Sequence, residues 1–184
     1  MFLLKYWSVI SRNYKGGDPM EFMEAFETLL KKSEANLKKG IDQIRYELAM
    51  KGISKTPSGA DLYLDQCIEL LANETLKALA EIREFIGKPK EWELIRATLN
   101  RFIEEQCDSF HDFLVNSWGQ SSDQILNQLN LVKSSVKQEH GMYIDRQKLK
   151  LSRREHLLKD LIKILIFGLA AGIVAFLLKI IFSR

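Results

Sequence analysis

The feature that most constrains this chain is an apolar segment close to its C-terminus. Residues 164–178 read ILIFGLAAGIVAFLL, 15 residues without a polar side chain. If Lys163 and Lys179 reach the bilayer surface with their ammonium groups, the apolar stretch extends over residues 161–182. As a helix this stretch would be roughly 33 Å long, close to a hydrocarbon core of about 30 Å. A helix that is apolar on every side needs a bilayer or a large protein around it. The sequence therefore predicts a transmembrane helix over residues 161–182.

The position and flanking charges of this segment predict its orientation. Only Ser183 and Arg184 follow it, which is the arrangement of a tail-anchored, single-pass protein. The N-terminus, MFLLKYWSVISRNYKGG, is a poor secretory signal, because Lys5 interrupts its apolar part and no small-residue cleavage site follows. Residues 133–163 carry nine Lys or Arg against four Asp or Glu, whereas residues 1–132 carry 16 against 20. Because basic residues collect on the cytosolic side of a span, we expect the N-terminal body to be cytoplasmic and the C-terminus to lie across the membrane.

Small residues follow one face of the predicted span. Gly168 and Gly172 form a GxxxG pattern, and Ala171 and Ala175 continue the spacing on nearly the same face. Such a face lets two helix backbones approach closely, and it predicts self-association of the span into a homo-oligomer. Glycine and alanine are also common in spans that do not associate, so simple packing freedom is the alternative.

The rest of the chain has the pattern of long helices. Its composition, 46% hydrophobic and 28% charged with a net charge of +3, is that of a folded protein rather than a disordered one. No strand-like alternation is sustained, and apolar residues recur at helical spacing. Four helices are expected, over residues 18–51, 56–87, 89–118 and from 121 onward. Because they are long and joined by short connections, we predict an all-α, elongated antiparallel bundle of about four helices with a C-terminal transmembrane helix.

The fourth of these helices loses its apolar stripe after Val136. His140, Gln147 and Arg154 take positions where apolar residues would continue it, and Gly141 interrupts the sequence. We therefore expect the helix to leave the bundle there as an exposed stalk. The predicted organisation is an amphipathic N-terminal segment (1–17), a cytosolic helical bundle (18–140), a basic juxtamembrane stalk (141–160) and the anchor (161–182). Residues 1–17 either lie on the bilayer or cover the bundle.

Basic residues gather close to the predicted span. Lipid headgroups are the counter-charge that we expect for them, because no motif that reads nucleic acid accompanies the basic run. The predicted membrane-surface residues are Arg146, Lys148, Lys150, Arg153, Arg154, Lys159 and Lys163.

The sequence contains no pattern typical of an enzyme. The best candidate site is Cys107 with His111, which share a helix face, but a zinc site needs further nitrogen or sulfur ligands. Phosphate-binding loops, nucleophile elbows and paired Glu-x-x-His motifs are missing. The only other thiol is Cys67, and two cysteines in a chain of 184 residues do not form a disulfide scaffold. We expect no catalytic activity, no metal and no cofactor.

Taken together, these features predict a tail-anchored membrane protein whose cytosolic bundle acts as an interaction or tethering module. It would bind the lipid bilayer, a second copy of itself and a protein partner, and no nucleic acid. The alternative is a membrane-perturbing effector or toxin of the defence type, which would act through oligomerised spans. The apolar character of residues 164–178 argues against the alternative, because no polar face is available to line a pore.

Overall fold

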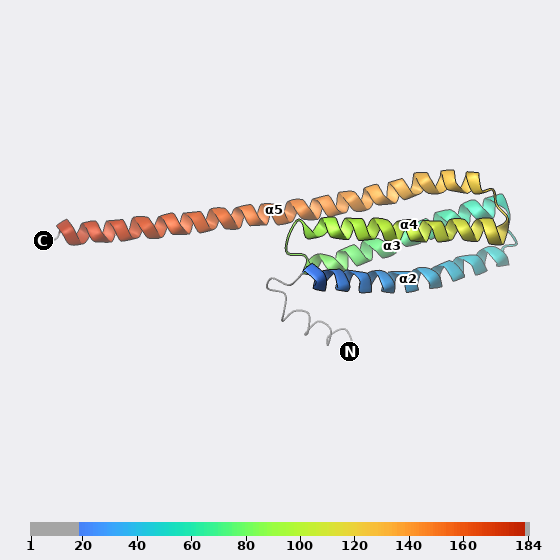
Figure 1. Ribbon diagram of the computed structural model, residues 1–184, viewed down its shortest axis with the longest axis horizontal. Coiled ribbons are helices and arrows are strands. Elements are labelled where there is room, and N and C mark those ends of the chain that lie inside the picture. The colour runs from blue at the N-terminus through green and yellow to red at the C-terminus, as the bar shows by residue number, and fades with distance from the viewer. Residues whose placement is uncertain (1–18, 183–184) are drawn as a thin grey trace, which may run out of the picture.

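The computed structural model describes residues 19–182, and it describes the surroundings of side chains over residues 22–167. Within this range the chain forms four α-helices, a short 3-10 helix and no strand (Figure 1). The helices are α2 (Pro19–Met50), α3 (Pro57–Ile82), α4 (Glu91–Trp118) and α5 (Ser122–Phe182), and the 3-10 helix η1 (Arg83–Phe85) follows α3. The predicted all-α helical bundle is confirmed. The predicted segment 1–17 lies outside the described residues.

Local sequence signals set the helix ends. The side chain of Thr56 caps α3 by accepting a hydrogen bond of 3.0 Å from the backbone N–H of Gly59, and Pro57 occupies the first helical position. Gly119 ends α4 in the left-handed conformation, with φ of 68°. Its N–H donates to the carbonyl of Val115 over 3.1 Å, which satisfies one of the last carbonyls of the helix.

The four helices form two antiparallel hairpins that pack side by side. The α2–α3 hairpin meets the α4–α5 hairpin where α2 and α3 both contact α4 and where α3 contacts α5, and α2 and α5 lie on opposite sides of the bundle (Figure 1). Because the chain runs up, down, up and down, the beginning of α2 and the end of α3 lie at the same end of the bundle as the point where α5 projects from it. We call this the exit end.

A continuous apolar core fills the space between the helices. The buried side chains of α3 include Leu64, Ile68 and Leu71 at helical spacing. Trp92, Ile95 and Leu99 of α4 are fully buried. Aromatic rings close the other end of the core, where Tyr63 lies 5.2 Å from Phe113 and 5.3 Å from Trp118 between ring centroids. These contacts stabilise the bundle through burial and ring packing.

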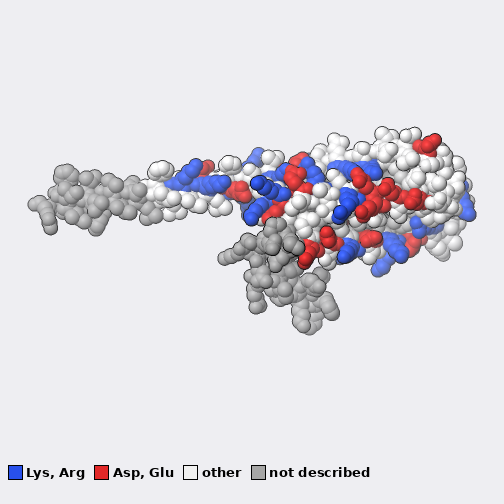
Figure 2. All heavy atoms as spheres, viewed as in Figure 1, with Lys and Arg blue, Asp and Glu red and all other residues white. Residues whose placement is uncertain are grey.

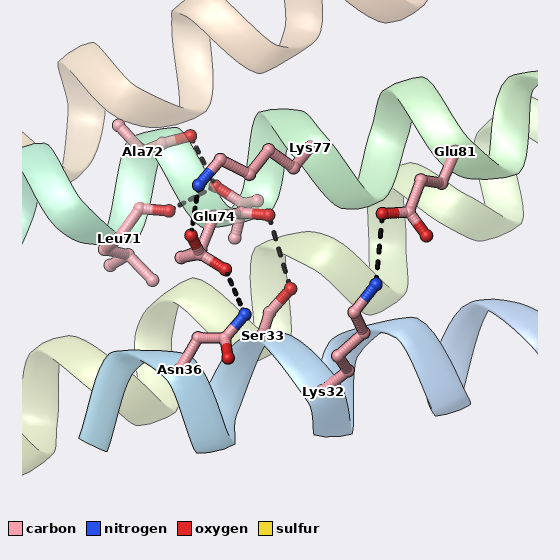
Figure 3. Close-up of polar contacts among 9 residues, drawn as sticks. Lys32, Ser33, Asn36, Leu71, Ala72, Glu74, Lys77 and Glu81 are labelled. Carbon is pink, nitrogen blue, oxygen red and sulfur yellow. Dashed lines mark hydrogen bonds and ion pairs between the residues drawn. The ribbon is translucent and has the colours of Figure 1, made fainter. Parts of the chain in front are cut away.

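One buried carboxylate lies between α2 and α3 (Figure 3). Glu74 of α3 accepts a hydrogen bond of 2.8 Å from the side-chain amide of Asn36 on α2, and the Lys77 ammonium also donates to it. Burial on its own would raise the pKa of the Glu74 carboxyl, but the hydrogen bonds from Lys77 and Asn36 outweigh it and hold the pKa below the ordinary value. The Ser33 hydroxyl donates to the Glu74 backbone carbonyl over 3.3 Å, so the same turn of α3 is tied to α2 twice.

Helix α5 stays packed against the bundle beyond the point where the sequence suggests that it leaves. Ile144 is fully buried, His140 and Gln147 are buried, and Leu151 packs partly against the core. His140 is tolerated in the core because both of its ring nitrogens have hydrogen-bond partners there. The bundle therefore includes α5 through about Leu151, so the first half of the predicted 141–160 stalk belongs to it.

Past this point α5 projects from the bundle as a single helix (Figure 1). From Arg153 to Phe167 every side chain is exposed. Of the residues that the structure describes, none belongs to a helical stretch that is both long and apolar enough to cross a membrane. The backbone of α5 continues to Phe182, and the side chains of residues 168–182 lie outside the described set.

Candidate functional site

The basic residues predicted to face a membrane surface do not share one environment. Lys148 forms an ion pair with Glu93 of α4, and Arg146 lines a groove between α3 and α5. Lys163 lies 3.7 Å from Asp160 on the projecting part of α5. Lys159 is exposed there, while Lys150, Arg153 and Arg154 surround a hollow at the exit end. Figure 2 shows Lys and Arg side chains gathered on α5 around the point where it leaves the bundle.

Ion pairs join α4 to α5 along their contact, the α4–α5 seam. They give several of the lysine and arginine side chains there a carboxylate partner. Besides the Lys148–Glu93 pair, Lys137 contacts Glu104 and Arg96 contacts Asp145. The hydrogen bond from Lys148 lowers the pKa of Glu93, and the hydrogen bond from Lys137 lowers the pKa of Glu104. Because these pairs are open to solvent, each contributes little to stability. Their more specific effect is to fix how α5 lies along α4.

The hollow at the exit end, which we call the exit hollow, has a volume of about 590 Å³. It lies where η1, the start of α4 and the last packed turns of α5 come together. Residues from three separate parts of the sequence line it: Arg83, Glu84, Ile86, Trp92, Gln147, Lys150, Leu151, Arg153 and Arg154. Its volume is typical of a small-molecule site.

The exit hollow combines unpaired cations with a buried donor. Arg83, Lys150, Arg153 and Arg154 form no ion pair with any residue in the described range, and Glu84 is the one carboxylate in the lining. Trp92 is fully buried, and its indole Nε1 makes no hydrogen bond to another described residue. A buried N–H without an acceptor is uncommon, because leaving it unpaired costs about 1–3 kcal/mol.

A second depression, which we call the α3/α5 groove, runs between those two helices. Its volume is about 790 Å³, and its floor is mostly apolar. Leu70, Leu76 and Ala80 of α3 face Met142 and Tyr143 of α5 across it. The groove exists because α3 and α5 touch only sparsely, each packing mainly on its hairpin partner.

The small-residue face predicted for self-association falls on the C-terminal part of α5. Gly168, Ala171, Gly172 and Ala175 belong to the helical backbone of α5, and their side-chain surroundings lie outside the described residues.

Cys107 and His111, the candidate pair from the sequence, have surroundings typical of residues that support the fold. Cys107 is buried, and burial raises the pKa of its thiol to about 11. His111 hydrogen-bonds instead across the α4–α5 connection, with 3.0 Å between its Nε2 and the Ser122 hydroxyl. Cys67 is also buried, and burial raises its thiol pKa to about 12. Over the described range, no group of three or more His, Cys, Asp or Glu side chains is arranged to hold a metal ion.

Sequence reasoning found part of the exit hollow and missed the rest. The sequence predicts that Lys150, Arg153 and Arg154 bind headgroups, whereas Arg83 and Trp92 carry no signal of their own.

Comparisons with known proteins add no template for either depression. No protein-family model matches the chain, and neither a curated protein nor a solved structure shows significant similarity to it.

Proposed function

We propose that this protein is a membrane-anchored tethering module, in which residues 161–182 lie in a bilayer and the helical bundle is held close to its surface. The observation that carries the proposal is the exposed apolar surface of projecting α5. Leu157, Leu158, Leu161, Ile162 and residues 164–167 are each more than half exposed. Exposing this much contiguous apolar surface to water is costly, and such surfaces mark contact with a membrane or another protein.

The continuity of α5 supports the same proposal. One helix of 61 residues, roughly 90 Å long, joins the core of the bundle to the apolar segment without a break. Arg154 lies seven residues before Leu161, which corresponds to about 10 Å along the helix axis. The exit end therefore faces the bilayer at close range, and the basic residues between the two lie at headgroup level.

The tethering part of the proposal assigns two contact surfaces. The face of Gly168, Ala171, Gly172 and Ala175 brings two copies together within the bilayer, as small-residue faces do. The α3/α5 groove offers an apolar surface for a protein partner, with Met142 exposed at its edge. A cytoplasmic bundle and the absence of catalytic activity complete the proposal.

The test of anchoring is membrane fractionation of the full chain in cells. Leu169→Lys with Ile173→Lys places two charges near the centre of the apolar segment, each costing about 2.5–3.5 kcal/mol on insertion. We expect the wild-type chain to resist extraction at alkaline pH and this variant to be released. Leu169→Phe with Ile173→Phe is the matched control and should stay in the membrane. Release of the wild-type chain at alkaline pH, to the same extent as the lysine variant, would remove the basis of the proposal.

Self-association and membrane damage are read in the same cells. Crosslinked dimers should form with wild type and with Val174→Leu, and should be lost with Gly172→Leu, which adds bulk to the small-residue face. Membrane potential should stay unchanged throughout. If the wild-type chain depolarises the membrane and Gly172→Leu does not, the protein is a membrane-perturbing effector instead.

A further inference from the structure

We propose that the exit hollow is a binding site for a phosphate group, with a phospholipid headgroup or a soluble phosphorylated compound as its source. This inference deepens the proposed function, because a phosphate site at the exit end would couple the bundle to the surface on which it stands. The lining of the hollow comes from η1, the η1–α4 connection, α4 and α5, and it includes no residue of the segment 161–182.

The first observation is the state of the cations around the hollow. Along the α4–α5 seam, Arg96, Lys137 and Lys148 each have a carboxylate partner on the facing helix. One turn further on, this pairing stops. Arg83 of η1 and three residues of α5, Lys150, Arg153 and Arg154, line one hollow, and none of them forms an ion pair with a described residue. Their mutual repulsion is relieved if an anion is bound between them.

The second observation is independent of charge. Trp92 is one of the residues that line the same hollow, and its indole N–H is buried without an acceptor in the described part of the chain. A phosphate has several acceptor oxygens, so one group can take the indole hydrogen bond while its other oxygens contact guanidinium groups. Chloride or a single carboxylate would leave more of these donors unused.

The shape of the hollow favours a headgroup-sized ligand rather than an ion alone. Its volume of about 590 Å³ exceeds that of a phosphate, and Ile86 and Leu151 supply an apolar wall. Glu84 is on the lining and disfavours additional negative charge close to it. The ligand that fits is thus a compact phosphomonoester or phosphodiester with a neutral or hydroxyl-bearing remainder.

The experiment follows the Trp92 indole resonance by proton–nitrogen NMR of the full chain in a non-ionic detergent. Glycerol 3-phosphate is the soluble probe. For the second arm the chain is placed in nanodiscs of phosphatidylcholine, with or without one-fifth phosphatidic acid. Trp92→Phe identifies the resonance among the three tryptophans of the chain.

We expect a saturable downfield shift of the Trp92 N–H, because it gains a hydrogen-bond acceptor. Arg153→Gln with Arg154→Gln should weaken binding at least tenfold, and Glu84→Gln should tighten it. Lys38→Gln with Lys39→Gln removes the same charge from exposed positions on α2 and should bind as wild type does. A shift with phosphatidic acid at concentrations where glycerol 3-phosphate gives none identifies a lipid headgroup, and the reverse identifies a soluble ligand.

Two results would overturn the inference. One is an unchanged Trp92 resonance in both arms. The other is equal weakening by the Arg153/Arg154 and the Lys38/Lys39 substitutions, which would mean that only net charge matters. Because the soluble arm needs no bilayer, failure of anchoring in the fractionation experiment leaves this result readable, and failure here leaves the anchoring result intact.

Discussion

His140 of α5 and Thr75 of α3 lie 2.8 Å apart between Nε2 and Oγ1, inside the apolar core. The other ring nitrogen of His140 faces the backbone carbonyl of Val136, so both nitrogens have partners. The Thr75 hydroxyl also lies 2.6 Å from the carbonyl of Leu71, and its one proton serves one acceptor at a time. This polar contact joins the two hairpins at a point where α3 and α5 otherwise touch sparsely.

Removing the Thr75 hydroxyl should reveal the free-energy cost of burying His140 without a hydrogen-bond partner for its Nε2. Thr75→Val keeps the shape of the side chain and leaves Nε2 of His140 without a partner. We expect the free energy of unfolding to fall by about 1–3 kcal/mol, measured by urea denaturation of the full chain in mild detergent. Adding His140→Leu removes the orphaned group and should recover part of the loss. A double variant less stable than Thr75→Val would contradict this assignment.

The Glu74 carboxylate should make the bundle sensitive to acid. Its pKa in the folded protein lies below the ordinary value of 4.5, so it stabilises the fold above pH 4.5. That contribution is lost as the pH falls through the lower folded-state pKa. Glu74→Gln should therefore cost roughly 1–3 kcal/mol at pH 7, with the difference from wild type vanishing in strong acid.

An exposed carboxylate on the same helix is the matched control for Glu74. Glu81 pairs with Lys32 over 3.3 Å, and both side chains are at least half exposed. Glu81→Gln should change the free energy of unfolding by less than about 1 kcal/mol. Stability curves against pH that are parallel for wild type and Glu74→Gln would show that the Glu74 hydrogen bonds do not stabilise the folded state.

Alanine substitutions of single side chains along α5 should locate the end of the bundle. Ile144 is fully buried, whereas Leu158 is 59% exposed. Ile144→Ala should cost about 2–5 kcal/mol, and Leu158→Ala should stay within about 0.5 kcal/mol, by urea denaturation in detergent. Similar small effects at both positions would place the end of the bundle before Ile144.

Gly141 should be replaceable by alanine with a gain in stability. It lies inside α5, and a Cβ built there meets no atom within 4 Å. Gly141→Ala should raise the free energy of unfolding by about 0.4–1 kcal/mol, because alanine restricts the unfolded chain more. Gly59→Ala is the opposite case, since its Cβ would lie 2.0 Å from the carbonyl oxygen of Ile53. Thermal unfolding followed by circular dichroism compares the midpoint of each variant with that of the wild-type chain. A midpoint below wild type for Gly141→Ala would show that the glycine is required.

The helices were predictable because their determinants are local. Thr56 and Pro57 begin α3 and Gly119 ends α4, where the sequence places these boundaries. Apolar residues that recur at helical spacing on α3, among them Leu64, Ile68 and Leu71, form its buried face. The packed length of α5 was not predictable, because a polar residue such as His140 is expected to face solvent unless its partner is known. That partner, Thr75, is 65 positions away in the sequence.

The candidate site was predictable in charge but not in shape. Lys150, Arg153 and Arg154 stand out as a basic run next to an apolar segment. Arg83 and Trp92 join them only because the end of α3 and the start of α4 meet at the exit end. Which cations remain unpaired also depends on the facing helix, since Lys148 looks like its neighbours in sequence yet contacts Glu93.

Because α5 is one helix from Ser122 to Phe182, the number of residues between bundle and apolar segment sets an angle as well as a height. One inserted residue would turn the bundle by about 100° around the helix axis and raise it by about 1.5 Å. Four inserted residues would bring the bundle back to within about 40° of its original direction. The number of residues in the run 152–160 thus determines the direction in which the α3/α5 groove points relative to residues 161–182.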